Sequence, residues 1–182
     1  TSQNSKAKIA QKLMKRIESI ALIDSILVNK NDFLRGFKLA KDIGTLNREL
    51  IKTKKNTWSD KITFTTQRGD RQCFSDTARS NFDIFSSFKL LDVWSIPVSI
   101  SAEINTKANE NYPFLLLDGV TLYFASDGEN SIGGYDIFVT KYSAATQKYL
   151  SPENVGFPFN SPANDYMMVI DENQKVGWFA TD

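Results

Sequence analysis

The sequence predicts a mostly β protein that begins with an α-helical segment, and three observations support this fold class. The chain changes in composition near residue 60: all five prolines, seven of the nine glycines and all but three of the 22 aromatic residues lie after it. Residues 61–182 contain an internal repeat of short apolar runs separated by turn residues. Before residue 60, apolar residues recur at the helical spacing of three and four.

The first element is predicted to be an amphipathic helix from about Ser5 to Ile20. Asn4 or Ser5 can cap its start, because the side-chain oxygen can accept a hydrogen bond from a backbone N–H that the first turn leaves unpaired. Its apolar stripe consists of Ile9, Ala10, Leu13, Met14, Ile17 and Ile20. Such a helix either docks on the protein or binds an acidic surface. Docking is favoured, because residues 1–60 carry a net charge of +7 and residues 61–182 a net charge of −6.

The segment after this helix is predicted to turn to extended structure. Ile26-Leu27-Val28 has a β-like composition, and residues 29–32 are rich in turn-forming asparagine and aspartate. We expect residues 24–39 to add a strand to the first repeat. The basic stretch KTKKNTW at 52–58 is interpreted as a solvated linker, which divides the chain into a helical and irregular segment, 1–60, and a repeat region, 61–182.

The repeat is anchored by a phenylalanine that follows a turn pair. Phe74, Phe124 and Phe179 are separated by 50 and 55 residues. The turn pairs before them are Arg68-Gly69, Asp118-Gly119 and Asn173-Gln174, and a strand-like run precedes each pair. Asp-Gly is the strongest of these turn signals, because glycine adopts a positive φ without steric cost. Each repeat therefore starts with a predicted hairpin.

The alignment of the first two repeats continues beyond the hairpin. Asp83-Ile84-Phe85 matches Asp136-Ile137-Phe138, and Asn105-Thr106 matches Asn160-Ser161. A repeat of this length with three or four short strands is typical of a β-propeller blade. The sequence thus predicts a partial β-propeller of about two and a half WD-like blades, and we expect the chain to be a fragment of a longer protein.

Six residues are predicted to build the blades rather than to bind a ligand. Glycine suits backbone turns, and aspartate can bond exposed backbone amides. We expect the carboxylate of Asp136 to accept hydrogen bonds from the connection between Asp127 and Tyr135. The predicted structural residues are Asp83, Asp118, Gly119, Gly133, Gly134 and Asp136.

At the second repeat the sequence resembles a known family. NYPFLLLDGVTLYFASDGENSIGGYDIFVTKY, followed by GFPFNSPANDYMM, is similar to the WD-like repeats of TolB-type β-propellers in bacterial cell-envelope proteins. The resemblance covers about residues 61–182. It departs in the first repeat, where Arg68-Gly69 replaces Asp-Gly and the double glycine is missing before Phe82. The resemblance implies a periplasmic or outer-membrane-associated module that binds a protein or glycan of the envelope.

Composition narrows the possible chemistry. The chain has no histidine, the commonest general base and metal ligand, and its single cysteine, Cys73, cannot form an internal disulfide. No apolar run has the length of a membrane helix, and the net charge of +1 gives no signal for nucleic acid. We predict no cofactor and no enzymatic activity. The alternative is a propeller-class glycosidase or lyase that uses a pair of carboxylates, although no pair stands out.

The loop after Phe124 is the weak candidate for a cation site. Asp127, Glu129 and Asp136 offer oxygen ligands, as calcium requires. Their spacing does not follow the EF-hand pattern. We therefore predict a hydrogen-bonded turn here and no metal.

Overall fold

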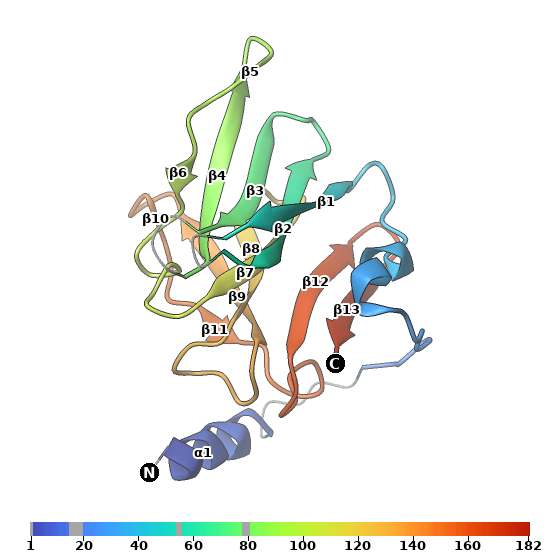
Figure 1. The fold of residues 1–182 in the computed structure, drawn as a ribbon, viewed down its shortest axis with the longest axis vertical. Helices are drawn as coiled ribbons and strands as arrows, with labels where there is room; N and C mark the ends of the chain where they lie inside the picture. The colour runs from blue at the N-terminus through green and yellow to red at the C-terminus, as the bar shows by residue number, and fades with distance from the viewer. Residues whose placement is uncertain (1, 15–19, 54–55, 78–80) are drawn as a thin grey trace.

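A computed structural model describes residues 2–14, 20–53, 56–77 and 81–182 of the chain. It confirms the mostly β fold class with an N-terminal helix. The strands form three antiparallel sheets that follow one another along the chain (Figure 1). The helix α1 lies at one end of the molecule, below the sheets in the view of Figure 1.

The first sheet has six strands. Its order is β1-β2-β3-β4-β5. The short strand β6 also pairs with β4, at Phe85 and Ser86, whereas β5 pairs at Lys89 and Leu90. The strands are β1 (Gly44–Lys52), β2 (Trp58–Thr66), β3 (Arg71–Asp76), β4 (Asp83–Leu90), β5 (Val93–Trp94) and β6 (Val98–Ser99).

The second and third sheets follow the same hairpin order with fewer strands. The second has the order β10-β9-β8-β7, with β11 paired to β9, and the third consists of β12 and β13. The strands are β7 (Glu110–Leu115), β8 (Thr121–Ser126), β9 (Asp136–Ser143), β10 (Lys148–Tyr149), β11 (Glu153–Asn154), β12 (Asp165–Asp171) and β13 (Val176–Thr181).

The repeat inferred from the sequence has a counterpart in the backbone geometry. The pairing of β7 with β8 shifts register after Asn111, and the pairing of β12 with β13 shifts after Tyr166. At both shifts a non-glycine residue has a positive φ: Tyr112 at 55° and Met167 at 57°. Two bulges of one kind, 55 residues apart, show that β7 and β12 have equivalent positions in their sheets.

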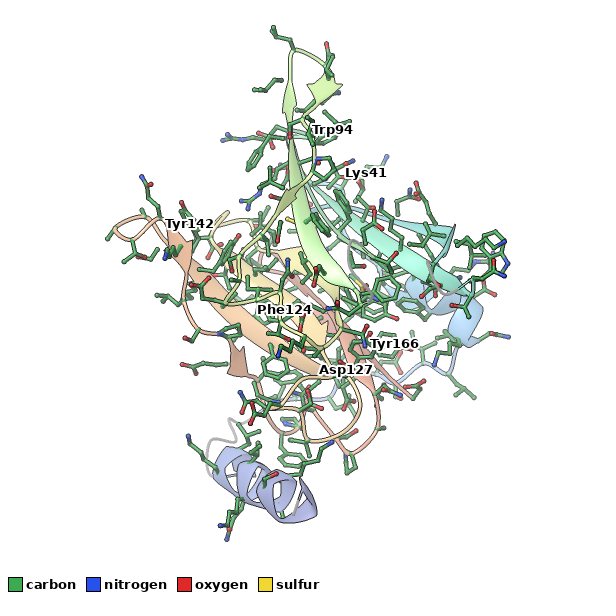
Figure 2. The ribbon with its side chains drawn as sticks, turned by 60° about the vertical axis from the view of Figure 1, so that its left-hand side comes forward. Lys41, Trp94, Phe124, Asp127, Tyr142 and Tyr166 are labelled. Carbon is green, nitrogen blue, oxygen red and sulfur yellow. The ribbon has the colours of Figure 1, made fainter. Side chains whose placement is uncertain are left out.

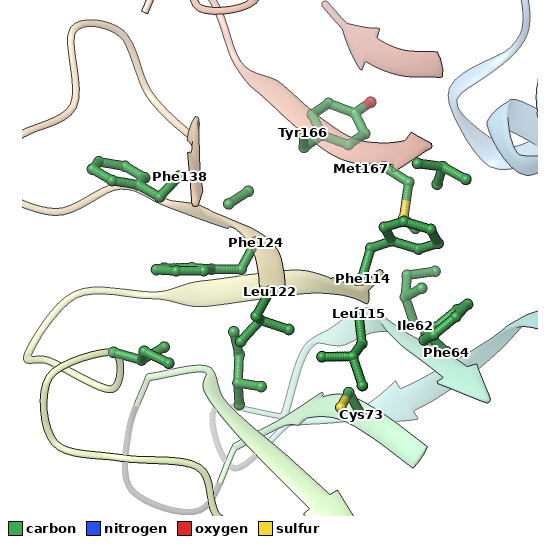
Figure 3. Close-up of a cluster of buried hydrophobic side chains, with 14 of the residues drawn as sticks. Ile62, Phe64, Cys73, Phe114, Leu115, Leu122, Phe124, Phe138, Tyr166 and Met167 are labelled. Atoms are coloured by element: carbon green, nitrogen blue, oxygen red, sulfur yellow. The ribbon is translucent and has the colours of Figure 1, made fainter. Parts of the chain in front are cut away.

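The core lies between the sheets. Phe114 of β7 is fully buried, and its ring meets that of Phe64 of β2 with centroids 4.7 Å apart. Met167 of β12 is also fully buried and belongs to the same hydrophobic cluster as Phe114 (Figure 3). Cys73 of β3 is buried in the same cluster. The three sheets therefore share one continuous core.

The described part of the N-terminal helix docks on the rest of the molecule through an apolar residue and a lysine. α1 spans Ser2–Met14, and Ile17 lies outside the described residues. Leu13 is buried against Gly156, where an added Cβ would lie 3.2 Å from that of Leu13. Lys6 donates a hydrogen bond to the carbonyl oxygen of Gly133 at 2.8 Å, so the helix docks with a lysine as well as with its apolar stripe.

The predicted strand at residues 24–39 was wrong. Residues 20–29 have no regular secondary structure and belong to no sheet, and residues 30–36 form the short 3-10 helix η1 (Lys30–Gly36). The extra strand of the first sheet is β1, at Gly44–Lys52. An apolar run becomes a strand only where an edge accepts its backbone, and in the first sheet β1 occupies that edge. The expected boundary at residue 60 lies inside β2, so the first sheet includes residues on both sides of it.

Candidate functional site

Asp136 organises the long loop that joins β8 to β9. Its carboxylate accepts hydrogen bonds from the backbone N–H groups of Ile132 at 2.7 Å and Gly133 at 3.1 Å, and from the Asn154 side chain at 2.7 Å. These are the backbone bonds expected from the sequence. Burial raises the pKa of Asp136, although the bonds from Ile132, Asn154 and Gly133 each act to lower it. The carboxylate serves as an anchor for the loop.

Asp83 occupies the equivalent place at the start of β4. The Asn81 side chain donates to its carboxylate at 3.2 Å and to the carbonyl oxygen of Ala108. Asn81 aligns with Gly134 of the second repeat, where the double glycine stands. The first repeat thus uses an amide side chain where the second brings two backbones close together.

The double glycine is required by a close approach of the chain. A Cβ on Gly133 would lie 2.1 Å from the carbonyl oxygen of Ala163, and a Cβ on Gly134 would lie 2.1 Å from the Asn164 side-chain oxygen. The backbone N–H of Gly134 donates to the carbonyl of Ala163 at 3.0 Å. Only glycine allows the loop to lie against the segment that leads into β12.

That segment is one of two equivalent clasps, defined as residues 105–110 and 160–165. Each begins with an asparagine whose side chain bonds both polar groups of one isoleucine backbone. Asn105 accepts from the N–H of Ile84 at 2.7 Å and donates to its carbonyl at 2.8 Å. Asn160 does the same with Ile137, at 2.8 and 2.9 Å. The asparagine therefore acts as an additional strand residue beside β4 and β9.

The last residue of each clasp is an acid, which accepts hydrogen bonds from a threonine or serine within the same clasp. Glu110 accepts from the N–H and the hydroxyl of Thr106, and Asp165 accepts from the N–H and the hydroxyl of Ser161. Burial raises the pKa of Glu110, against the lowering effect of its hydrogen bonds. These residues occupy matching positions in the two repeats of the sequence, but the match does not reveal that they hydrogen-bond to one another. The repeated asparagine and hydroxyl pair was the available signal.

The candidate cation ligands do not converge. Asp127 accepts from the N–H and the side-chain amide of Asn109, both at 2.7 Å, whereas Asp136 is engaged with the loop backbone. Glu129 is exposed. Among the described residues there is no group of three or more histidine, cysteine, aspartate or glutamate side chains placed to hold a metal ion.

A surface hollow of about 310 Å³ lies between the loop after β6 and the hairpin of β9 and β10. Tyr142 and Tyr149 meet edge to face at its wall, with centroids 5.4 Å apart. Arg71 donates to the Tyr149 hydroxyl at 3.1 Å. The lining residues are Ile100, Ser101, Ala102, Glu103, Tyr142, Gln147, Lys148 and Tyr149. Glu103 is the single carboxylate among them, so this hollow offers no pair of acids for glycoside cleavage.

One exposed apolar feature of the described repeat region is the arm, defined as residues 88–98. It comprises the end of β4, the turn, β5 and the start of β6, and it projects from the sheets at the top of Figure 1. Figure 2 shows the side chains of the arm, with Trp94 labelled; Trp94 itself is half-buried. Its exposed apolar residues are Phe88, Leu90, Leu91, Val93, Ile96 and Val98.

The turn of the arm has an unusual residue. Leu91 and Asp92 both have a positive φ, at 47° and 66°, as a tight primed hairpin turn requires. Such turns favour asparagine or glycine, and leucine is uncommon at a positive φ. The Leu91 side chain is 99% exposed, so burial within the molecule does not explain its presence.

The equivalent hairpin of the second repeat has only small and polar residues at its turn. It joins β9 to β10 through Ala144, Ala145, Thr146 and Gln147, and its turn residue with a positive φ is Gln147. The two hairpins therefore share a place in their sheets but differ in surface chemistry. Within the described residues, no helix is both long enough and apolar enough to cross a membrane.

The chain was compared with protein-family models, with curated proteins and with solved structures, and no match was found.

Proposed function

We propose that this protein is a non-enzymatic binding or scaffold module of the bacterial cell envelope, and that it contacts a partner protein through the arm. The observation that carries this proposal is the exposed apolar surface from Phe88 to Val98. Exposed apolar patches of this kind mark interaction sites, because water solvates them poorly. The envelope location rests on the resemblance of residues 61–182 to TolB-type propeller repeats.

The conformation of the turn supports this role. A leucine at a positive φ costs free energy that asparagine or glycine would avoid. The Leu91 side chain gains no burial within the molecule, and a contact with a partner protein would supply the compensating gain. The hairpin between β9 and β10 occupies the same position in its sheet and has no leucine at its turn. The sheet itself therefore does not require an apolar tip.

The arrangement of acids favours binding over catalysis. The buried carboxylates of Glu110, Asp136 and Asp165 hold backbone amides, and Asp171 accepts from the N–H of Gln174. A propeller-class enzyme acting on carbohydrate needs two acids facing one cavity. The hollow beside Tyr142 has one, Glu103, and its aromatic wall suits a glycan contact as the second candidate.

Site-specific photo-cross-linking in the bacterial envelope tests the proposal. A photoreactive residue is placed at position 91, with position 145 in the hairpin between β9 and β10 as the matched control. We expect position 91 to give a discrete adduct with one protein, and the adduct to disappear when Val93→Lys is added. Position 145 is expected to give none. The same adducts at both positions would contradict the assignment to the arm.

Two further results would favour the other candidates. Glycan-array binding that is lost in Tyr142→Ala and retained in Val93→Lys would move the contact to the hollow. Release of reducing sugar from a polysaccharide, abolished by Glu103→Gln, would establish the enzyme alternative.

A further inference from the structure

The two faces of the arm differ in chemistry. Phe88 and Leu90 point to the same side of β4, because alternate residues of a strand share a face. Val93 of β5 lies directly opposite Leu90 and therefore joins them on that side. The side chains of all three residues are exposed. Together they form what we call the apolar face of the arm.

The opposite face of the arm is held by contacts within the arm itself. Lys89 is paired with Trp94, which is half-buried. The Lys89 ammonium also forms an ion pair with the Asp92 carboxylate at 3.3 Å. The apolar face is thus the side of the arm that has most to gain from a contact that removes it from water.

The apolar face continues onto Arg71 at the base of the arm. Arg71 of β3 lies directly opposite Phe88, and its guanidinium carbon is 5.2 Å from the centre of the Phe88 ring. The Arg71 side chain is half-buried. It donates hydrogen bonds to the Tyr149 hydroxyl at 3.1 Å and to the Gly119 carbonyl oxygen at 3.3 Å, and neither acceptor is charged.

The charge of Arg71 lacks a carboxylate in the described part of the chain. None of the ion pairs between described residues includes Arg71, and its buried Nε meets no hydrogen-bond acceptor there. A half-buried cation without a counter-charge retains part of the cost of leaving water. A guanidinium matches a carboxylate in charge and in planar geometry, so a carboxylate is the group that would offset this cost best.

We propose that the arm receives an apolar segment of a partner protein, and that a carboxylate of this segment binds Arg71. The inference rests on the proposed role of the arm and adds the chemistry of the partner. Three residues separate Phe88 from Leu91 at the tip, which corresponds to about 10 Å along a strand. The partner segment therefore presents apolar side chains over about this length, followed by an aspartate, a glutamate or a C-terminal carboxylate.

The tip of the arm favours a protein over a lipid surface as the occupant. The Asp92 side chain is 97% exposed, directly beside Leu91 in the turn. Insertion of the tip into a bilayer would bring this carboxylate into hydrocarbon, which is costly. At the edge of a protein contact the same carboxylate can stay in water, because the rim of such an interface is polar and accessible to solvent.

The photo-cross-link at position 91 measures the contribution of Arg71. We expect Arg71→Gln to reduce the yield of the adduct to about a tenth, because it removes the charge. Arg71→Lys keeps the charge and is expected to retain more of the adduct than Arg71→Gln. The matched control is Lys89→Gln, which removes a cation from the opposite face and should leave the yield unchanged. Thermal unfolding confirms that each variant is folded.

Carbodiimide coupling of the Arg71→Lys variant tests for the carboxylate itself. This reagent joins an amine to a carboxylate that touches it, through an amide bond. We expect mass spectrometry to find such a bond between position 71 and an acidic group of the same protein that position 91 traps. Arg71→Gln offers no amine at this position and is expected to give no bond there.

The outcomes separate this inference from the proposed function. An adduct at position 91 whose yield is the same in Arg71→Gln would overturn the role of Arg71 and leave the arm as a contact site. No adduct at position 91 in the wild type would overturn both. An amide bond from position 71 to a second copy of the chain would overturn the separate partner. Binding to phosphatidylglycerol vesicles that is lost in Val93→Lys would overturn the protein occupant in favour of a membrane.

Discussion

In this chain buried carboxylates at turns accept hydrogen bonds from backbone N–H groups, a role that neighbouring strands fill within a sheet. Asp136 alone takes three donors, two of them backbone N–H groups in a loop without regular structure. A buried amide that loses its acceptor retains the cost of leaving water. The stability of the loop therefore depends on one side chain.

At this scale we predict the effect of Asp136→Ala. The N–H groups of Ile132 and Gly133 would lose their acceptor, and the free energy of unfolding is expected to fall by about 1–3 kcal/mol. Urea denaturation measures it. Glu129→Ala in the same loop is the control, because this residue is exposed and a surface change of this kind stays within about 0.5 kcal/mol. A wild type whose melting temperature drops with chelator, while the variant does not respond, would instead indicate a cation in the loop.

Hairpins are the element that the sequence predicts best. Asp118-Gly119 lies between β7 and β8, with Gly119 at a φ of 70°, and Arg68-Gly69 lies between β2 and β3, with Gly69 at 67°. A turn depends on residues that are adjacent in the chain, so its signal is local. β1 was not predicted, because its alternation of polar residues becomes meaningful only once β2 offers an edge.

Residues 20–28, with the sequence IALIDSILV, show the converse limit. They have strong β propensity, yet propensity alone does not supply the partner strand that would satisfy their backbone groups. The sequence shows that Asn105-Thr106 and Asn160-Ser161 occupy matching positions in the two repeats. Their hydrogen bonds to Ile84 and Ile137 could not be read from the sequence, because each bond joins residues more than 20 positions apart.

The Asp118 turn carries a prediction about pH. The Asp118 carboxylate accepts from the N–H groups of Val120 and Thr121 and from the Thr121 hydroxyl. Burial acts to raise its pKa, but these three bonds together with the charge of Lys141 outweigh burial, so the pKa lies below the usual value of 3.8. A lowered pKa in the folded state stabilises the protein above the unfolded value, and this stabilisation is lost as pH falls through the folded value.

Asp118→Asn is therefore expected to be less stable than the wild type at neutral pH. The difference should shrink as the pH falls below 3.8, where the wild-type carboxyl also loses its charge. Thermal unfolding across this pH range measures the effect, which is smaller than that of Asp136→Ala because the Asp118 turn is exposed. A constant difference at all pH values would show that the charge of Asp118 contributes nothing.

The whole molecule behaves as three sheets around one core, and its central contact is the ring of Phe114 on that of Phe64. Phe114→Ala removes a fully buried ring between the first and second sheets. We expect a loss of about 3–5 kcal/mol in one cooperative transition. Fluorescence reports this directly, because Trp58 and Trp94 lie in the first sheet and Trp178 in the third. Separate transitions for the two sets of tryptophans would show that the sheets fold independently.

The clasps also define where one repeat could be exchanged for another. Residues 105–110 enter the second sheet but are bonded to Ile84 of the first, and residues 160–165 enter the third but are bonded to Ile137 of the second. A recombination joint placed in the loop between sheets would separate each clasp from the isoleucine it holds. A joint placed in the hairpin turn at Asp118-Gly119 would keep both clasps with their own partners. Duplication of such a module, or its transplantation into a chimera, is therefore expected to succeed when the cut is made inside a sheet.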